Sequence, residues 1–360
     1  MIGQKGIPAT HGGPERHVEE LAVRLAARGH DVIVYTRPNY ADPALRTYKG
    51  VRLVSRPTVG TKHLDAITHT ALCTAAALRE KVDVFHYQAE GPALLCWVPR
   101  LAGKATVVTI HGQDWRRDKW GAAAKAVLRA GEWVSFKVPR ATISVSESLA
   151  GELEATYGRR AVFIPNGVSL SPDSDDGVLE EFGLRKERYV LFAARLVPEK
   201  GLHYLLDAWR RGFPGFKLAV AGGSVFSDDY VAAVQADPPP GVVFTDWQHG
   251  ARLASLFRNA ALYVLPSDLE GLPIVLLEAL GYGTPVLASD IAQNREVLGR
   301  YGATFRRGSV DDLEQRLLEC LTGLPALKEG ALDAQKTIAH AYDWEVVTDR
   351  TLEVYRSVLG

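Results

Sequence analysis

The 360-residue sequence predicts an α/β protein with two Rossmann-like, doubly wound domains that face a central cleft. One observation behind this prediction is that short β-branched runs alternate with amphipathic helical patterns along almost the whole chain. A second is that these runs are continuously apolar, which is typical of parallel strands covered by helices on both faces. The expected strands are 31–36, 51–55, 82–87, 105–110 and 141–146 in the first half, and 189–194, 217–223, 242–245, 261–266, 284–289 and 303–305 in the second.

The third observation is an acidic, turn-rich segment at 169–183, SLSPDSDDGVLEEFG, which lies between the two halves and is typical of a linker. Ligands of open α/β sheets bind at the carboxyl ends of the strands, and a cleft between two such domains can exclude water from a reaction. We therefore expect functional side chains in the loops that follow strands.

The composition is that of an ordinary globular protein, with 47% apolar residues, 23% charged residues and a formal net charge of zero. This balance gives no sign of a nucleic-acid partner. The cysteines, Cys73, Cys96 and Cys320, are far apart, which argues against structural zinc and favours a reducing, cytoplasmic setting. Charged residues, glycine or proline interrupt every apolar stretch and the first residues lack a signal-peptide core, so we expect no membrane span.

The segment DLEGLPIVLLEALGYG, residues 268–283, contains two glutamates in one of the most apolar parts of the chain. Glu270 follows an expected strand and precedes a helix that begins near Pro273. The backbone N–H groups of Gly271 and Leu272 lie beside it at this helix N-terminus, where anions and hydroxyls bind readily. The alternative is that Glu270 is a solvated loop residue.

Glu278 lies about one and a half turns inside the same helix, which is apolar on nearly every face, so the sequence predicts that its carboxylate is buried. A buried carboxylate without a partner costs several kcal/mol, roughly, and it therefore finds a partner or becomes neutral. Its same-face neighbours, Ile274, Gly281 and Tyr282, cannot neutralise it. The alternative is a structural ion pair with a distant arginine.

The spacing E-x7-E after a strand, with GLP between the glutamates and GTPV after them, resembles the donor-binding signature of the retaining family-four glycosyltransferases of the GT-B fold. The resemblance implies that Glu270 contacts hydroxyls of the donor sugar, with Gly271, Leu272 and Pro273 assisting. It also implies that Glu278 accepts hydrogen bonds from the ribose hydroxyls of the nucleotide, which would keep it ionised without a protein partner.

The resemblance extends to a cationic site for the diphosphate. The segment FAARLVPEKG, residues 192–201, matches the family's R-x4-K spacing, with Arg195 just after a strand and Lys200 before the next helix. Two fixed cations stabilise the negative charge that grows on a departing nucleoside diphosphate. The family also often has a histidine at the place of His111, where it reaches the donor sugar. The alternatives are two ordinary surface cations and a structural histidine.

The N-terminal pattern G-x-x-G-I-P…G-G-x-E resembles a rhamnosyltransferase-like bacterial branch of the family. Gly12 and Gly13 would let the backbone approach the acceptor and the diphosphate at the start of a helix, with Gly13 also contacting the donor. Glu90, in the loop after the strand 82–87, is a further acceptor-side candidate. Its position favours the alternative of a solvated loop residue.

The resemblance covers nearly the whole chain and implies a hinge at the P-N-G-V junction, residues 165–168. It divides the chain into an acceptor-side domain of residues 1–167 and a nucleotide-sugar-binding domain of residues 168–342, with a last helix at 343–360 that packs back on the first domain. The pattern departs from expectation at the start, because only two residues precede Gly3 where a central strand needs about five or six. The start lies upstream, or the first strand is short.

The implied reaction is a retaining transfer of a hexosyl or deoxyhexosyl group from a UDP-, GDP- or dTDP-sugar to a glycan or lipid-linked saccharide, as in bacterial cell-surface polysaccharide synthesis. The leaving diphosphate would help deprotonate the acceptor, so we expect no protein nucleophile and no metal or other cofactor. The alternative from another class is a nucleotide-dependent oxidoreductase or a nucleotide-sugar epimerase with two Rossmann-like domains.

The segment 115–140 is strongly basic, with seven Lys or Arg residues against two acidic ones, Asp118 and Glu132. Basic amphipathic helices with interleaved aromatic residues lie on anionic membranes, and the family often uses lipid-linked acceptors. This pattern predicts peripheral contact of a cytoplasmic protein with the inner face of the cell membrane. The alternative is an ordinary helix that buries its aromatic side chains, which in this segment are Trp115, Trp120, Trp133 and Phe136.

Overall fold

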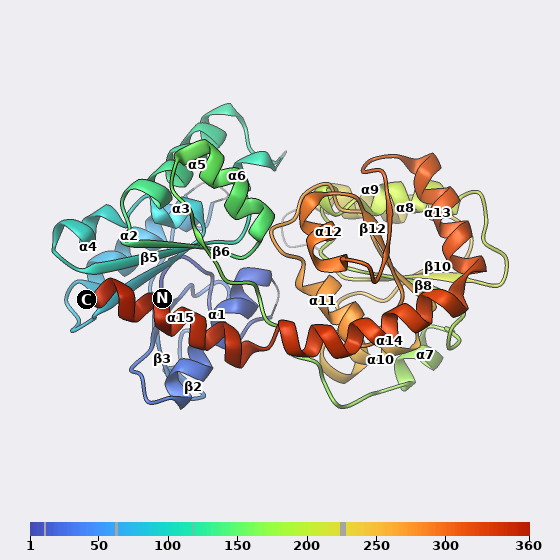
Figure 1. The fold of residues 1–360 in the computed structure, drawn as a ribbon, viewed down its shortest axis with the longest axis horizontal. Coiled ribbons are helices and arrows are strands. Elements are labelled where there is room, and N and C mark those ends of the chain that lie inside the picture. Colours follow the sequence, from blue (N-terminus) through green and yellow to red (C-terminus); the bar gives the residue numbers. More distant parts are fainter. Residues whose placement is uncertain (11, 62–63, 118, 224–227) are drawn as a thin grey trace. The chain divides into compact units, whose positions relative to one another are not determined.

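The computed structural model describes residues 1–10, 12–61, 64–117, 119–223 and 228–360. The chain divides into two compact units, Met1–Gly167 with Trp344–Gly360, and Val168–Asp343 (Figure 1). Both units are α/β structures with predominantly parallel sheets, as predicted, and every expected strand segment contains a strand.

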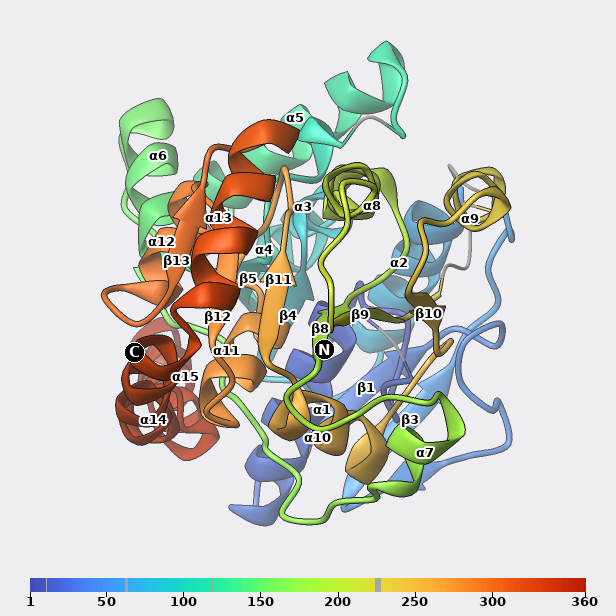
Figure 2. The same ribbon diagram turned by 90° about the vertical axis from the view of Figure 1, so that its right-hand side faces the viewer.

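The second unit is built on a six-stranded, entirely parallel sheet with the order β10-β9-β8-β11-β12-β13, which can be followed across Figure 2. The chain enters this sheet in the middle, proceeds outwards on one side, and then returns to the other side of its first strand. This reversal creates a topological switch point between β8 and β11. The strands are β8 (Tyr189–Ala193), β9 (Lys217–Ala221), β10 (Val242–Phe244), β11 (Leu262–Leu265), β12 (Val286–Ser289) and β13 (Ala303–Phe305).

Helices cover this sheet and bury an apolar core that includes Phe192, Leu205 and Leu313. The expectation of a linker over 169–183 is wrong for its second half, because residues 177–181 form a helix that buries Val178 and Leu179. The helices of this unit are α7 (Gly177–Glu181), η2 (Pro198–Lys200), α8 (Leu202–Trp209), α9 (Asp228–Ala236), α10 (Gly250–Asn259), α11 (Ile274–Gly281), α12 (Ala292–Leu298), α13 (Val310–Thr322) and α14 (Leu324–Ala341).

The first unit contains two sheets, with the orders β1-β3-β2 and β4-β5-β6-β7. Its strands are β1 (Ile33–Thr36), β2 (Thr47–Tyr48), β3 (Val51–Ser55), β4 (Val84–Gln88), β5 (Ala105–Ile110), β6 (Ala141–Ser144) and β7 (Val162–Phe163). The first residues of the chain join the two sheets: Ile2 donates to the carbonyl of His86 at 2.9 Å, and Tyr35 donates to the carbonyl of Met1 at 3.2 Å. A short first strand segment, with a bridge between Ile2 and Tyr87, therefore lies between β1 and β4.

The helices of the first unit are α1 (Gly13–Ala27), α2 (Asp65–Ala77), α3 (Glu90–Ala93), α4 (Trp97–Leu101), η1 (Asp114–Arg116), α5 (Ala122–Lys137), α6 (Glu147–Tyr157) and α15 (Trp344–Leu359). The C-terminal α15 lies along α1 (Figure 1). Leu352 packs between Leu21 and Leu25, while Arg28 pairs with Glu345 at 2.6 Å and with Asp349 at 2.6 Å.

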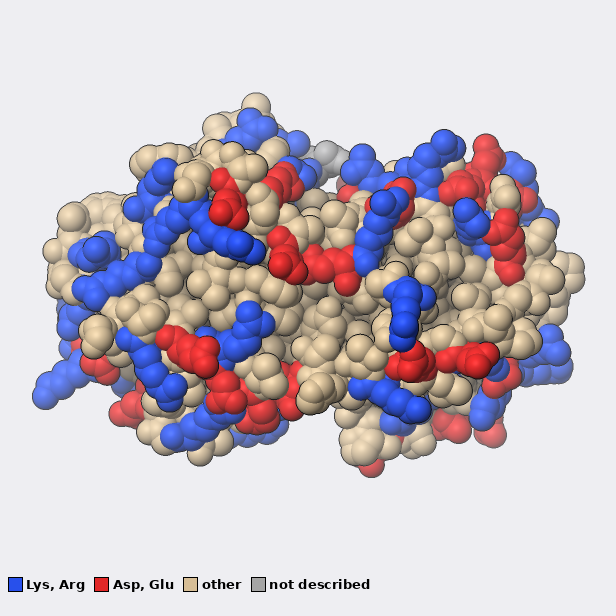
Figure 3. All heavy atoms as spheres, in the orientation of Figure 1, with Lys and Arg blue, Asp and Glu red and all other residues tan. Residues whose placement is uncertain are grey.

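Acidic and basic side chains are interspersed on the face of the molecule in Figure 3, as the balanced composition leads us to expect. Within the described ranges, no helix combines the length and the apolar character that a membrane crossing requires.

Candidate active site

The loops after β8 and β11 meet at the switch point of the second unit. Lys200, the last residue of η2, pairs with Glu270 in the β11 loop, with 2.5 Å between Nζ and Oε1. The Lys200 side chain is 13% exposed and the Glu270 side chain 7%, so the ion pair is largely shielded from solvent. The two residues are 70 positions apart in the sequence, and the reversal in strand order brings them together.

Close backbone contacts hold the loops of this edge against one another. Gly201 has a φ of +69°, and a Cβ there would lie 2.0 Å from the carbonyl oxygen of Pro266, just after β11. Gly222, just after β9, has a φ of +142°, and a Cβ there would lie 1.9 Å from the carbonyl oxygen of Ala194, just after β8. Neither position has space for a side chain, so only glycine fits.

Buried polar residues fix the β11 loop further. The Ser289 hydroxyl donates to the carbonyl of Ser267 at 2.5 Å, and the Asn294 amide donates to Ser289 Oγ at 2.9 Å. All three side chains are fully buried. The Asp268 amide donates to the carbonyl of Glu199 at 2.9 Å, which ties this loop to η2. These residues could not be predicted from the sequence, because single serines and asparagines carry no distinctive spacing.

Glu278 lies on α11 and is only partly buried, so the expectation of full burial is wrong. The helix buries Leu276, Leu277, Ala279 and Leu280, whereas the face that carries Glu278 remains partly accessible. An apolar pattern on nearly every face does not reveal which face the neighbouring elements leave uncovered.

Burial and the carboxylates of Glu270 and Glu278 all raise the pKa of a buried tyrosine in β11, Tyr263. Burial raises the pKa of Tyr263 well above its ordinary value, and the carboxylates of Glu270 and Glu278 act in the same direction. Tyr263 donates to the carbonyl of Ala193 at the end of β8, at 3.2 Å. The two carboxylates thus lie near the junction of β8 and β11.

Arg195 follows the end of β8 by two residues and has a partly exposed side chain. Pro273 precedes α11, and its carbonyl accepts the Leu276 amide at 3.0 Å in the first helical turn. The structure therefore gathers most predicted donor-side residues along the carboxyl ends of β8 and β11, namely Arg195, Lys200, Glu270, Gly271, Leu272, Pro273 and Glu278.

His111 lies in the first unit, directly after β5, and donates its Nε2–H to Oε1 of Gln88 at 2.8 Å. Its buried surroundings lower its pKa well below the ordinary value, and the nearby His17 and His86 act in the same direction. The imidazole is therefore neutral at pH 7. It can exchange hydrogen bonds with a hydroxyl, but it cannot supply a proton as an imidazolium ion.

A carboxylate lies at the glycine pair where α1 begins. Gly12 has a φ of +101°, and a Cβ there would lie 2.0 Å from Oε2 of Glu15. The Lys5 amide donates to Oε1 of Glu15 at 3.1 Å. Glu15 thus ties the preceding loop to the N-terminus of α1, whose positive end favours a carboxylate beside Gly12 and Gly13. Glu15 was not among the predicted site residues, although the fourth position of the G-G-x-E pattern is the sequence signal that marks it.

Glu90 is fully buried at the start of α3, so the expectation of a solvated loop residue is wrong. The Asp114 amide donates to its Oε2 at 3.2 Å. Gly131 of α5 allows the close approach that buries it, since a Cβ at Gly131 would lie 2.4 Å from the Glu90 carbonyl oxygen. The next residue, Glu132, is also buried and accepts hydrogen bonds from Gln113 at 3.0 Å, Trp115 at 2.9 Å and Tyr157 at 2.5 Å.

Burial raises the pKa of Glu90 well above its ordinary value, and the carboxylates of Asp114 and Glu132 raise it further. An acid whose pKa is higher in the folded state stabilises the fold at pH values below its unfolded pKa, about 4.3. This contribution is lost as the pH rises towards the folded pKa, by about 1.4 kcal/mol for each unit of elevation.

Glu90→Gln is therefore expected to unfold at a higher temperature than the wild type at pH 8, because glutamine resembles the protonated acid and needs no proton. The advantage should shrink at pH 5, where the wild type retains more of its protonated form. Calorimetric melting at both pH values measures the difference. A Glu90→Gln protein that is equally destabilised at pH 5 and pH 8 would show that Glu90 is ionised in the fold.

The basic segment 115–140 does not form one helix. Trp115 belongs to η1, and a separate helix, α5, begins at Ala122. Phe136 is fully buried, whereas Val127 is 54% exposed and Trp133 is 51% exposed. The solvent-facing side of α5 also includes Arg129, Lys137 and several alanines. Asp118 lies outside the described residues.

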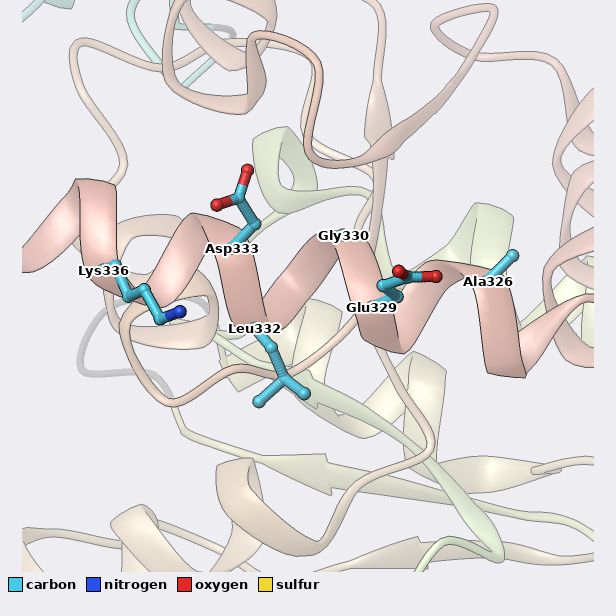
Figure 4. A pocket seen from close by; sticks show the side chains of 6 residues that line it. All are labelled: Ala326, Glu329, Gly330, Leu332, Asp333 and Lys336. Atoms are coloured by element: carbon cyan, nitrogen blue, oxygen red, sulfur yellow. The ribbon is translucent and has the colours of Figure 1, made fainter.

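A hollow of about 590 Å³ lies beside α14. Figure 4 shows that the side chains around it all belong to this one helix, among them Glu329, Asp333 and Lys336. None of the residues singled out in the sequence lines it, and Asp333 is paired with Arg300 at 3.0 Å. We therefore place the candidate active site at the strand ends and not in this hollow.

Comparison with known proteins shows the class of protein. Residues 11–172 match the family model of Glycosyltransferase Family 4, and residues 179–329 match that of Glycosyl transferases group 1. These two matches lie end to end and cover most of the chain. The protein is thus a glycosyltransferase, and it belongs to the family-four enzymes of the GT-B fold.

Two relatives illustrate the similarity in sequence. A phosphatidyl-myo-inositol mannosyltransferase of Mycobacterium leprae (strain TN) is 28% identical, and the alignment covers 96% of this chain and 93% of the relative. A glycogen synthase of Mycobacterium tuberculosis (strain ATCC 25618 / H37Rv) is 26% identical, with 99% of this chain and 93% of the relative covered. These names are those of a mannosyltransferase and a glycogen synthase, so the expected rhamnosyltransferase-like branch is not confirmed.

Solved structures with the same fold are less similar in sequence. A sucrose-phosphate synthase from Thermosynechococcus elongatus superposes with a TM-score of 0.84 at 18% identity, covering 99% of this chain and 95% of that one. Anabaena Alr3699/HepE in complex with UDP-glucose superposes with a TM-score of 0.80 at 19% identity, covering 97% of each chain. Both likenesses support the two-domain fold.

Proposed function

We propose that the protein is a retaining glycosyltransferase that moves a hexosyl or deoxyhexosyl group from a nucleotide sugar to a glycan or lipid-linked saccharide. We further propose that it works in the cytoplasm, in the synthesis of bacterial cell-surface polysaccharide. The observation that carries this proposal is the shielded Lys200–Glu270 pair at the switch point between β8 and β11. Nucleotides bind at such switch points in doubly wound sheets.

Each residue at this edge has a chemical role in the proposed reaction. Arg195 and Lys200 supply the positive charge that a departing diphosphate requires, and Lys200 also pairs with Glu270. Glu270 accepts hydrogen bonds from hydroxyls of the donor sugar, and Glu278 accepts them from the ribose. Neutral His111 contributes a hydrogen bond to the sugar from the first unit.

The names of similar proteins support a nucleotide-sugar donor and a saccharide or lipid-linked acceptor. One structural neighbour was solved with UDP-glucose, and one relative is a phosphatidyl-myo-inositol mannosyltransferase. The alternative of an oxidoreductase or epimerase is not favoured, because both family models describe glycosyltransferases.

A thermal-shift panel of UDP, GDP, dTDP and NAD tests the proposal, since a bound ligand raises the melting temperature by mass action. We expect one nucleoside diphosphate to stabilise the protein and NAD to have no effect. Nucleotide sugars with the matching base should then release nucleoside diphosphate when an acceptor extract is added. Stabilisation by NAD alone would reject the proposal.

We also propose that the exposed side of α5 rests on an anionic membrane. Its aromatic and aliphatic side chains, Trp133 and Val127, are exposed beside Arg129 and Lys137. Apolar side chains enter the headgroup region while the cations attract anionic lipids, which would bring the enzyme to a lipid-linked acceptor.

The protein is therefore expected to sediment with phosphatidylglycerol vesicles and not with phosphatidylcholine vesicles. Binding should be lost in about 1 M salt, where the Debye length falls to roughly 3 Å. The double variant Arg129→Glu/Lys137→Glu should stay in the supernatant. Arg210→Glu/Arg300→Glu, an equal charge change on exposed arginines of the second unit, should sediment like the wild type. Absence of the wild type from the pellet at low salt would refute membrane contact through α5.

A further inference from the structure

A buried histidine of α1 touches the candidate sugar-contacting residue of the first unit. His17 is 2% exposed, and its ring lies 4.9 Å from the ring of His111, centroid to centroid, at an interplanar angle of 76°. This is an edge-to-face arrangement, which restricts the rotation of both rings. No contact of this kind follows from the sequence, where the two residues are far apart.

The His17 ring also contacts the segments through which the chain leaves and re-enters the first unit. Trp344, the first residue of α15, lies 5.6 Å from His17 at an angle of 66°. Gly167, the last residue before the second unit, packs on the same tryptophan, since a Cβ there would lie 2.4 Å from the indole ring. His17 thus contacts both the His111 ring and the tryptophan on which Gly167 packs.

Hydrogen bonds fix the tautomers of His17 and His111. His17 Nδ1 lies 2.9 Å from Oδ1 of Asn166, the residue before Gly167. Because an amide oxygen only accepts, Nδ1 of His17 carries the hydrogen. By the same argument Nε2 of His111 carries the hydrogen that it donates to Gln88, so Nδ1 of His111 keeps its lone pair.

Both rings remain neutral at physiological pH. Burial lowers the pKa of His17 to about 4, and the bond to Asn166 offsets this only in part. Packing alone does not require an imidazole at this position, because phenylalanine would fill the space without the penalty of burying a polar ring. The imidazole adds a fixed hydrogen bond to the connection at Asn166.

From this geometry we infer that His17 is a positioning residue for the transfer reaction. It holds the ring of His111 in the orientation in which Nε2 donates to Gln88 and Nδ1 can accept a hydrogen bond from a hydroxyl of the donor sugar. His17 is itself held by Asn166 and Trp344, which lie in the two segments where the chain leaves and re-enters the first unit. The inference rests on the proposed function, since it assigns to His111 the contact with the donor.

The test is a double-mutant cycle on turnover, with His17→Phe, His111→Ala and the double variant. Phenylalanine keeps a ring of similar size but cannot bond Asn166. His17→Phe is expected to lower kcat about tenfold while donor KM changes less than about threefold, because a misoriented contact acts on the transition state. In the His111→Ala background the same substitution should change kcat less than about twofold, because residues that act through one another are not additive.

His69→Phe is the matched control. His69 is a fully buried histidine of the same unit, and its Nε2 bonds the carbonyl of Thr36 at 3.1 Å. It should leave kcat within about twofold of the wild type even where it lowers the melting temperature. Equal losses from His17→Phe in both backgrounds would make His17 a structural residue only and would overturn the inference.

Imidazole ¹⁵N NMR gives a readout that does not depend on activity. Wild-type His111 should show the Nε2–H tautomer that its bond to Gln88 selects. His17→Phe should give a mixture of both tautomers, because a His111 ring that has turned away from its native orientation loses that bond. An unchanged His111 signal in the variant would overturn the inference even if turnover falls. A wild type that transfers no sugar from any nucleotide sugar would reject the proposed function, while the NMR result would still decide whether His17 keeps the His111 ring in its bond to Gln88.

Discussion

Arg195→Ala is expected to lower turnover about 100-fold or more, the scale on which removal of one preorganised electrostatic contact acts. Arg195 stands just after β8, at the edge where Lys200 is already engaged with Glu270. Donor affinity should fall less than turnover, because the diphosphate gains negative charge mainly as the glycosidic bond breaks. Steady-state kinetics with the stabilising nucleotide sugar measure both effects.

Two further variants sharpen this result. Arg195→Lys should recover only part of the activity, since lysine lacks the planar fork that engages two phosphate oxygens together. Arg210→Ala removes an exposed arginine from the end of α8 in the same unit and should leave turnover unchanged. Full activity in Arg195→Ala would show that the diphosphate is bound elsewhere.

The same assay tests the proposal that protein cations and not a metal hold the diphosphate. Activity should survive EDTA largely intact if Arg195 and Lys200 supply the charge. Loss of activity in EDTA with recovery on addition of Mg²⁺ or Mn²⁺ would assign that role to a metal ion.

Glu278→Gln is expected to weaken donor binding by about 1.5–3 kcal/mol, the range for a hydrogen bond to a charged group. Because each 1.4 kcal/mol corresponds to a factor of ten, the dissociation constant should rise at least about tenfold. The partial exposure of Glu278 favours the lower end of this range. Titration calorimetry with the matching nucleoside diphosphate measures the change.

Circular dichroism separates a binding role for Glu278 from a structural one. Glu278→Gln should keep the native spectrum, and Glu329→Gln, on the exposed side of α14, should keep both spectrum and affinity. If Glu278→Gln unfolds while its remaining folded molecules bind the nucleotide normally, Glu278 serves the fold and not the donor.

The fold could be predicted from sequence because its determinants are local. Buried parallel strands require continuous apolar runs, and each run coincides with a strand, as in β5 and β11. The short strands β2 and β7 were missed, since two residues each carry no such pattern. The location of the expected donor-side residues near the ends of β8 and β11 was also predictable, because they follow apolar strand segments in the sequence, whereas their role in donor binding stays a prediction.

Features that depend on tertiary contacts could not be predicted. Glu90 looks like a loop glutamate until Gly131 lets α5 approach its backbone and removes it from water. His17 and Asn166 are separated by 149 positions, so nothing in either local sequence indicates that they share a hydrogen bond. Glu278 was placed on the correct helix, but only the packing of its neighbours determines how much water reaches it.

Gly201 and Gly222 have a consequence for how enzymes of this kind can diverge. Gly201 lies against the main chain of Pro266, and Gly222 lies against the main chain of Ala194, so neither position has space for a Cβ atom. The main-chain framework of the candidate site therefore cannot change by small steps, because any substitution of either glycine displaces the neighbouring loop. On the proposed function, we expect selectivity for a particular sugar or base to arise from the side chains around these glycines, so libraries aimed at altered donor choice should leave both glycines unchanged and vary their neighbours.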